Sequence, residues 1–246
     1  MTGWKTSSKR PEDRTDALQY YESGEGRSHT ETSAVKKIQE QITLRAVELL
    51  RPKLGTTIAA LKAGPTKRGL ALRGLTNLKP RFVPQTSAKT AAEFRPTVIL
   101  DAGCGTGFSL SVLSELGFKA KGFDLSPRLV ALARKKKLDA VVGDLRKIPF
   151  PPGSFGALIS ISALQWLLSE KYSDKEREEN VRKCASEFWR VLEKGGKAAV
   201  QFYPKSEEEL FWAGKIFKSA GFSVVVHQDN AQNGRKRKCF LLLEKP

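Results

Sequence analysis

Residues 98–110, VILDAGCGTGFSL, combine a short apolar run, three closely spaced glycines and the start of a helical pattern. Gly103, Gly105 and Gly107 follow the spacing G-x-G-x-G. Glycine lets a backbone turn tightly and approach a ligand closely. The stretch therefore predicts a first strand that a ligand-binding loop joins to a first helix.

Strand-like and helix-like segments alternate along the rest of the chain. We expect strands at 98–101, 119–124, 139–143, 157–162 and 197–203, and helices at 33–50, 108–116, 126–137, 174–192 and 206–220, with Gly195-Gly196 ending the helix at 174–192. The last two strands, 222–226 and 239–243, are separated by NAQNGRKRK, which is too short for a crossover helix, so they should pair antiparallel. The order predicts an α/β fold: a doubly wound, mostly parallel seven-stranded sheet with an antiparallel last strand and an N-terminal helical extension.

Acidic residues stand at the ends of the first three predicted strands. Asp124 ends the second strand in GFDLS, where a carboxylate can accept both hydroxyls of a ribose. Asp144 follows the third strand in VVGDL, in a position to meet an adenine amine. Asp101 stands beside the glycine loop, where an acid disfavours the diphosphate of a dinucleotide and suits the ammonium of an amino acid. This order of groups favours S-adenosylmethionine as cofactor, and with it the class I S-adenosylmethionine-dependent methyltransferase fold.

The positive charge of the chain is concentrated in one segment. The formal net charge is +17, and residues 51–96 carry ten Lys or Arg against a single acid, Glu93, a net charge of +9. Gly and Pro recur through this segment, which suits an arm that lies on a polyanion such as nucleic acid. The alternative is a solubilising surface loop. We therefore divide the chain into an N-terminal tail and helical lid (1–50), a basic insertion (51–96) and a Rossmann-like methyltransferase domain (97–246).

Composition also argues against several protein classes. No apolar run reaches about 18 residues, so no membrane-spanning segment is expected. The polar N-terminus lacks the apolar region of a secretory signal, so an intracellular protein is expected. Cys104, Cys184 and Cys239 are far apart and form no C-x-x-C pair. They predict buried thiols, with neither a disulfide framework nor a metal site.

Three stretches carry a resemblance to a known family: ISISALQWL (159–167), QFYPKSEEEL (201–210) and AGFS (220–223). They closely resemble the methyltransferases that modify guanine N7 in small-subunit ribosomal RNA, of the eukaryotic bud-site-selection and Williams-Beuren-region type and its archaeal relatives. The similarity extends upstream to residues 20–50 and is interrupted by the basic segment. ISIS-A-Q-W-L is the specific signature, because the glycine loop alone would match many unrelated methyltransferases.

The resemblance implies a set of site residues. Those expected to hold S-adenosylmethionine are Asp101, Gly103, Cys104, Gly105 and Gly107 at the loop, Asp124, Leu125, Asp144 and Leu145 after the next two strands, and Ser160 and Ile161 on the fourth. Those expected at the target base are Gln165, Trp166, Tyr203 and Pro204. Guanine N7 carries a lone pair and no proton at neutral pH, so the enzyme has to orient the base and needs no general base. Trp166 would stack on the guanine.

The resemblance also implies a substrate and a partner. The substrate is ribosomal RNA of the small-subunit precursor, in the cytoplasm of an archaeon or in the nucleus or nucleolus of a eukaryote. Family members typically work with a small zinc-binding activator subunit, and the third strand, expected at a sheet edge, offers a place for strand addition.

This chain departs from the family pattern at three places. Gly156 follows Phe155 where the family has Asp, Ala34 replaces an arginine, and His29 replaces a tyrosine. Two alternatives therefore stay open: an RNA-binding ribosome-assembly factor with dispensable catalysis, and a methyltransferase for another substrate.

Overall fold

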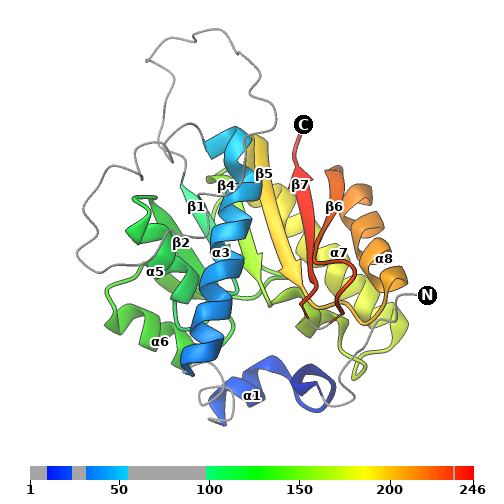
Figure 1. Cartoon of the computed structure of the whole chain (residues 1–246), viewed down its shortest axis with the longest axis horizontal. Coiled ribbons are helices and arrows are strands. Elements are labelled where there is room, and N and C mark those ends of the chain that lie inside the picture. Colours follow the sequence, from blue (N-terminus) through cyan, green and yellow to red (C-terminus); the bar gives the residue numbers. More distant parts are fainter. Residues whose placement is uncertain (1–9, 24–31, 55–97, 235) are drawn as a thin grey trace, which may run out of the picture.

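The computed structural model describes residues 10–23, 32–54, 98–234 and 236–246. Within these residues seven strands form one sheet in the order β3-β2-β1-β4-β5-β7-β6 (Figure 1). The strands are β1 (Ile99–Ala102), β2 (Ala120–Asp124), β3 (Ala140–Val142), β4 (Phe155–Ile161), β5 (Leu192–Phe202), β6 (Ser223–Asp229) and β7 (Lys238–Glu244). Neighbours among β1 to β5 pair in parallel, and β7 pairs antiparallel with β5 and β6. The predicted sheet is confirmed.

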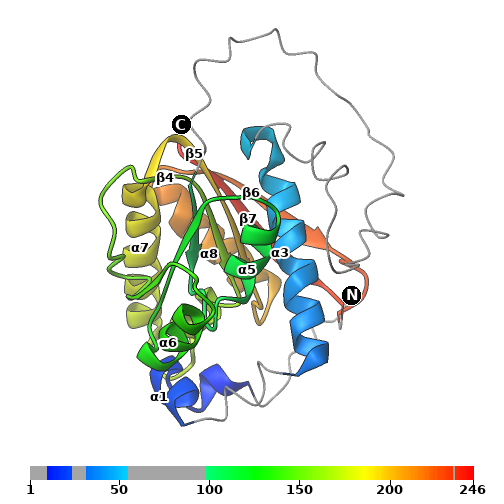
Figure 2. The same ribbon diagram turned by 90° about the vertical axis from the view of Figure 1, so that its left-hand side faces the viewer.

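Helices cover both faces of the sheet (Figure 2). They are α3 (Ser33–Leu54), α5 (Phe108–Glu115) and α6 (Pro127–Lys135) on one face, where α5 shares apolar clusters with both α3 and α6, and α7 (Asp174–Val191) and α8 (Glu207–Ser219) on the other. On the first face α3 buries Ile42 and Val47 against Ile159 of β4. On the second face Phe188 of α7 and Phe217 of α8 lie with ring centroids 5.9 Å apart. The chain order reverses between β1 and β4, and sheets of this kind bind ligands at the carboxyl ends of the strands at such a switch point.

The junction between α7 and β5 differs from the prediction. Gly195-Gly196 was expected to end the helix, but the helix ends at Val191 and β5 begins at Leu192. Gly195 donates its N–H to the carbonyl of Lys245 (2.7 Å), and Lys245 donates in turn to Gly196 (2.9 Å). Pairing with the segment after β7 therefore makes a strand of residues that read locally as a helix stop.

Residues 10–22, which we call the strap, run across the carboxyl ends of the strands (Figure 1). They contain the short helices η1 (Pro11–Asp13) and α1 (Ala17–Glu22). At one end Arg10 donates to the carbonyl of Tyr203 (2.5 Å), just after β5. At the other end the Ser126 hydroxyl, at the start of α6, donates to the Glu22 carboxylate (2.5 Å). The strap is thus tied down at both ends over the edge of the sheet that holds the switch point.

Two further predictions concern the character of the chain. Cys104, Cys184 and Cys239 are buried free thiols, as predicted. None of the helices in the described ranges combines the length and the apolar character that crossing a bilayer requires.

His29 and the basic segment 51–96 lie outside the described residues, apart from residues 51–54 at the end of α3. The division of the chain at residues 50 and 96 stays a prediction.

Candidate active site

A cavity of about 520 Å³ lies at the carboxyl ends of the central strands, between the sheet and the strap. Its volume is within the usual range for small-molecule sites. Nine of the predicted site residues line it: Gly103, Cys104, Gly105, Asp124, Leu125, Asp144, Leu145, Ile161 and Trp166. Leu18 and Tyr21 of the strap and Lys36 of α3 also line it. The structure therefore brings the glycine loop, the ends of three strands and the N-terminal region into one site.

The glycine loop has a backbone that only glycine adopts without strain. Gly103 and Gly107 have φ angles of +83° and +78°. The N–H of Gly103 donates to the carbonyl of Phe123 on β2 (2.9 Å), which fixes the loop against the neighbouring strand. A Cβ added to Gly107 would lie 2.4 Å from Cδ1 of Leu138, so a side chain there would have to displace Leu138. Gly107 itself caps α5 and is not part of the described cavity wall.

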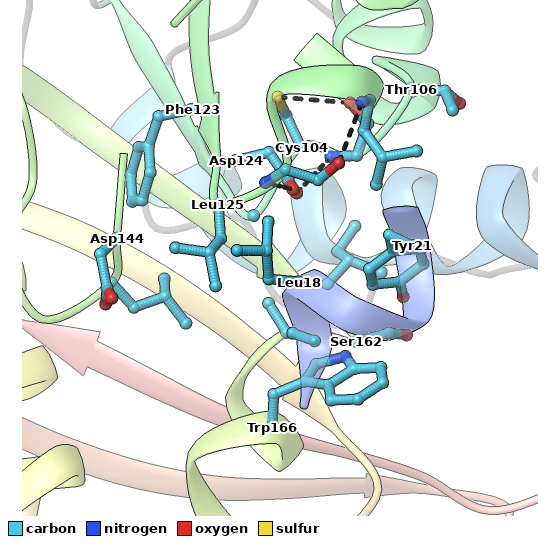
Figure 3. Close-up of a pocket in the computed structure, with 18 of the residues that line it drawn as sticks. Leu18, Tyr21, Cys104, Thr106, Phe123, Asp124, Leu125, Asp144, Ser162 and Trp166 are labelled. Atoms are coloured by element: carbon cyan, nitrogen blue, oxygen red, sulfur yellow. Dashed lines mark hydrogen bonds between the residues drawn. The ribbon is translucent and has the colours of Figure 1, made fainter. Parts of the chain in front are cut away.

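The Asp124 carboxylate is held by backbone donors and faces the cavity (Figure 3). Its Oδ2 accepts from the N–H of Gly105 (2.8 Å) and its Oδ1 from the N–H of Ser126 (3.0 Å). Burial raises the pKa of Asp124, and these hydrogen bonds oppose the rise. Because each carboxylate oxygen has two acceptor sites, one on each remains for a ligand. The group is therefore suited to the two hydroxyls of a ribose.

The Asp144 carboxylate is held in a different way. Arg146 donates to its Oδ1 through Nε (3.0 Å) and to its Oδ2 through Nη2 (2.6 Å), and Arg146 also donates to Asn180 (3.1 Å). Burial alone would raise the pKa of Asp144, but the hydrogen bonds from Arg146 hold it below its ordinary value. Asp144 lines the cavity away from Trp166 (Figure 3). An adenine amine that binds there has to share acceptor sites with Arg146, and this role stays a prediction.

The Asp101 carboxylate lies in the interior at β1, off the described cavity wall. The residue is 1% exposed, and neither of its oxygens has a hydrogen-bond partner among the described residues. Burial, and then the charge of Asp124, raises the pKa of Asp101 to about 8. An unpaired buried carboxylate is costly, so at neutral pH Asp101 either carries a proton or takes a cationic partner.

An aromatic cluster forms the opposite wall. Trp166 lies in η4 (Leu164–Leu168), directly after β4, and its ring centroid is 5.5 Å from that of Tyr20 and 5.6 Å from that of Tyr21. Burial raises the pKa of Tyr21, whose ring packs against the Trp166 indole. Figure 3 shows the two rings together at the side of the cavity formed by α1. The strap therefore completes the wall that carries Trp166.

Four further predicted residues are not part of the described cavity wall. The buried Ser160 hydroxyl donates to the carbonyl of Ala102 (2.9 Å), a link between β4 and β1. Gln165 is 9% exposed, and its Oε1 has no partner among the described residues. Tyr203 anchors the strap through its carbonyl, and the buried Pro204 follows it. Direct contact of these residues with a cofactor or base stays a prediction.

Sequence reasoning missed several residues of the wall. Lys36 lines the cavity from the first turn of α3, two positions after Ala34. Arg146 is the other basic residue in the described wall, and Asp144 and Asn180 already hold it. Lys36 is therefore the basic side chain available there to an anionic group. The sequence signal that could have identified Lys36 is its place in the same helical turn as Ala34, which replaces the family's arginine.

The residues present fit S-adenosylmethionine. Its ribose matches the two free acceptor sites of Asp124. Its ammonium is the kind of cation that the unpartnered Asp101 carboxylate lacks. Its carboxylate matches Lys36. The glycine loop leaves room for the backbone to approach the ligand closely.

Comparison with known proteins identifies the fold and the family. The profile of a family described as "Methyltransferase domain" matches residues 100–200. A TehB-like SAM-dependent methyltransferase from Corynebacterium glutamicum has the same fold, with 20% sequence identity and a TM-score of 0.50 over 63% of this chain and 84% of that one. At this level of identity the likeness shows the fold alone.

Sequence relatives are more specific. The 18S rRNA (guanine-N(7))-methyltransferase of Bos taurus is 32% identical over 238 residues, 96% of this chain and 71% of that protein. The 18S rRNA (guanine(1575)-N(7))-methyltransferase of Saccharomyces cerevisiae is 32% identical over 218 residues, 87% of this chain and 64% of that protein. The chain therefore belongs to the 18S rRNA (guanine-N7)-methyltransferase family.

Proposed function

We propose that this chain transfers a methyl group from S-adenosylmethionine to N7 of a guanine in small-subunit ribosomal RNA, as a step of ribosome biogenesis. The observation that carries the proposal is a single cavity, in a member of this family, that joins the glycine loop and Asp124 to the aromatic wall of Trp166. The relatives named above act on 18S rRNA at guanine N7. The same cavity offers their cofactor and their base adjacent places.

The chain's own residues hold the two ends of the cofactor in this proposal. Asp124 accepts the ribose hydroxyls, and the backbone of Gly103 and Gly105 lies against the amino-acid part. Lys36 pairs with the carboxylate, and Asp101 provides the negative charge for the ammonium. Two opposite charges held apart orient an amino acid in one direction only, which fixes the direction in which the sulfur presents its methyl group.

The reaction needs orientation more than acid–base chemistry. When bound, S-adenosylmethionine supplies a methyl group on a positively charged sulfur, which the N7 lone pair takes up as the carbon–sulfur bond breaks. No proton has to be removed from N7, so the site requires no general base near the acceptor. Holding the acceptor in line at close range lowers a barrier by about 7–11 kcal/mol in the best cases.

Trp166 provides a face on which a guanine can stack, and Gln165 is one residue away to read a base edge. Stacking of a base on an aromatic side chain contributes about 1–3 kcal/mol. In the present structure Tyr20 and Tyr21 contact the Trp166 ring. A guanine that stacks on the same face therefore requires α1 to move, and the tethers of the strap set how easily it does so.

Two partners follow from the proposal. The basic segment 51–96, with its net charge of +9, contacts the ribosomal RNA through phosphates. The activator subunit adds a strand to β3, which is an edge of the sheet. Val142 on β3 is 47% exposed, so a partner there also covers apolar surface. The protein acts where the precursors of the small ribosomal subunit are, which is the nucleus or nucleolus of a eukaryote or the cytoplasm of an archaeon.

The decisive experiment maps N7-methylguanosine in ribosomal RNA. Purified chain, alone and co-expressed with the activator, is incubated with unmodified small ribosomal subunits and methyl-labelled S-adenosylmethionine. We expect methylation at one guanosine, with higher activity for the co-expressed pair. Trp166→Ala serves as the matched variant with reduced activity.

The possible failures are distinct from one another. Cofactor binding by calorimetry with no methyl transfer to ribosomal RNA would favour another substrate. Absence of both cofactor binding and methylation, with RNA binding intact, would favour an assembly factor. Equal activity of the lone chain and the pair would remove the activator from the proposal.

A further inference from the structure

The turn that follows β4 has a strained backbone at a residue of the cavity wall. Ser162 has a φ angle of +57°, in the left-handed region that residues other than glycine rarely adopt. Lys137 and Asn230, the other such residues in the described ranges, lie in exposed turns, whereas Ser162 lines the cavity. Strain of this kind persists only where the surroundings enforce it.

A buried glutamine on β5 holds this turn. The Ser162 hydroxyl donates to Oε1 of Gln201 (3.0 Å), and the Ser162 N–H donates to the backbone carbonyl of Gln201 (3.0 Å). Nε2 of Gln201 donates to the carbonyl of Phe202 (3.2 Å), and Gln201 is 0% exposed. Burying an amide is costly unless its polar atoms are hydrogen-bonded. Here the Ser162 hydroxyl supplies the hydrogen bond that Oε1 of Gln201 accepts.

The glycine loop holds the same turn from the other side. A Cβ added to Gly103 would lie only 2.5 Å from Cβ of Ala163, the residue after Ser162. The turn is therefore fixed between β5 and the loop assigned to the cofactor. η4, which carries Trp166, begins at Leu164, immediately after the turn. The position of the acceptor wall relative to the glycine loop thus depends on Ser162 and Ala163.

We propose that Ser162 and Gln201 are positioning residues that set the spacing between the cofactor and the acceptor base. This inference rests on the proposed function. A glycine at position 162 would adopt the same backbone without strain, but it would lack the hydroxyl that ties the turn to Gln201. The serine therefore has a strained backbone, but its hydroxyl holds the turn in one position. Methyl transfer depends on that position, because a misplacement of about 1 Å can cost about 100-fold in rate.

The test compares Gln201→Met, Ser162→Ala and Ser162→Gly in the full chain with its activator. Gln201→Met keeps the volume of the side chain and removes the amide. We expect kcat to fall about 10- to 100-fold in Gln201→Met, with the Kd of S-adenosylhomocysteine within about twofold of wild type. Gln228→Met on β6 is the matched control, and we expect it to match wild type.

The two serine variants separate positioning from direct contact. Ser162→Ala keeps the backbone strain at position 162 and loses the hydrogen bond to Gln201, so the turn is free to relax. Ser162→Gly loses the same hydrogen bond, but glycine adopts the observed backbone without strain. We therefore expect Ser162→Gly to be more active than Ser162→Ala. Adding Ser162→Gly to Gln201→Met should likewise recover part of the lost kcat. Equal losses in Ser162→Ala and Ser162→Gly would overturn the proposal in favour of a hydroxyl that touches the substrate.

A readout without activity completes the test. Amide hydrogen exchange of residues 162–168, followed by mass spectrometry, should be faster in Gln201→Met than in wild type and unchanged in Gln228→Met. Unchanged exchange in Gln201→Met would show that Gln201 does not hold the turn. This measurement needs no methyl transfer, so a wild-type chain that fails to methylate ribosomal RNA would count against the proposed function alone.

Discussion

The two ends of the cavity are built from contacts of different range. At the cofactor end Asp124 is fixed by the backbone of Ser126, two residues away, and of Gly105, which lies 19 residues away in the preceding strand–loop–helix unit. At the acceptor end Trp166 is fixed by Tyr20 and Tyr21, which the strap brings from the N-terminal side of the chain. The first arrangement repeats a local pattern, whereas the second exists only once the strap is tied to both β5 and α6.

The difference separates binding from transfer. Residues of the cofactor end should affect the Kd of the cofactor, because they contact parts of it that do not react. Residues of the acceptor end should affect kcat and the use of RNA, because they place the base. A cofactor-end variant that changes only kcat, or an acceptor-end variant that changes only the Kd of the cofactor, would break this comparison.

Asp124→Ala should show the largest effect. It removes two acceptor sites for the ribose, and hydrogen bonds to a charged group contribute about 1.5–3 kcal/mol each. We expect the Kd of S-adenosylhomocysteine, measured by isothermal calorimetry, to rise roughly 100-fold or more. Asp139→Ala, at an exposed acid paired with Lys121, is the control and should bind as wild type does. Affinity of Asp124→Ala within about twofold of wild type would remove Asp124 from the ribose site.

Trp166→Ala should reduce kcat/KM for ribosomal RNA by roughly 10- to 100-fold through the loss of stacking. The Kd of S-adenosylhomocysteine should change by less than about threefold. Trp166→Phe keeps an aromatic face and should retain most of the activity. If Trp166→Ala weakened cofactor binding as strongly as it slowed transfer, the two ends of the cavity would not act separately.

Asp101→Asn should change how stability depends on pH. Burial raises the pKa of Asp101 to about 8, so between about pH 4 and pH 8 the folded chain holds a proton that the unfolded chain has released. The free energy of unfolding of the ligand-free protein should therefore fall as pH rises through this window. Differential scanning fluorimetry at pH 5.5 and 8.5 should show a drop in Tm for wild type and a smaller one for Asp101→Asn. Identical drops would place the titrating group elsewhere.

Lys36→Met should show the smallest effect. An ion pair between a solvent-exposed lysine and a carboxylate contributes about 0.2–1 kcal/mol, so we expect the Kd of S-adenosylhomocysteine to rise by about two- to fivefold. Lys36→Arg should keep the affinity. Lys37→Met, which removes an exposed charge next to the cavity-lining residue, should leave it unchanged. Equal effects of Lys36→Met and Lys37→Met would indicate a general field of positive charge and no specific contact.

Local patterns predicted much of the fold and of the cofactor end. Alternating strands and helices gave the seven-stranded sheet, because each segment carried its own apolar period and stop signals. The junction at Gly195 was predicted wrongly, since its strand conformation depends on pairing with Lys245. The aromatic partners of Trp166 were also missed, because nothing near position 166 in the sequence refers to Tyr20 or Tyr21.

The sequence by itself determined the glycine loop, the acid at the end of β2, the antiparallel closing hairpin and the family. Each of these rests on residues close together in the chain, where spacing alone limits the geometry. Only the tertiary structure decided which side chains meet around the acceptor: the strap over Trp166, Gln201 beneath Ser162, and Ala163 against Gly103. Such contacts join residues far apart in sequence. They are set by tertiary packing, and no periodic pattern of residues along the chain indicates them.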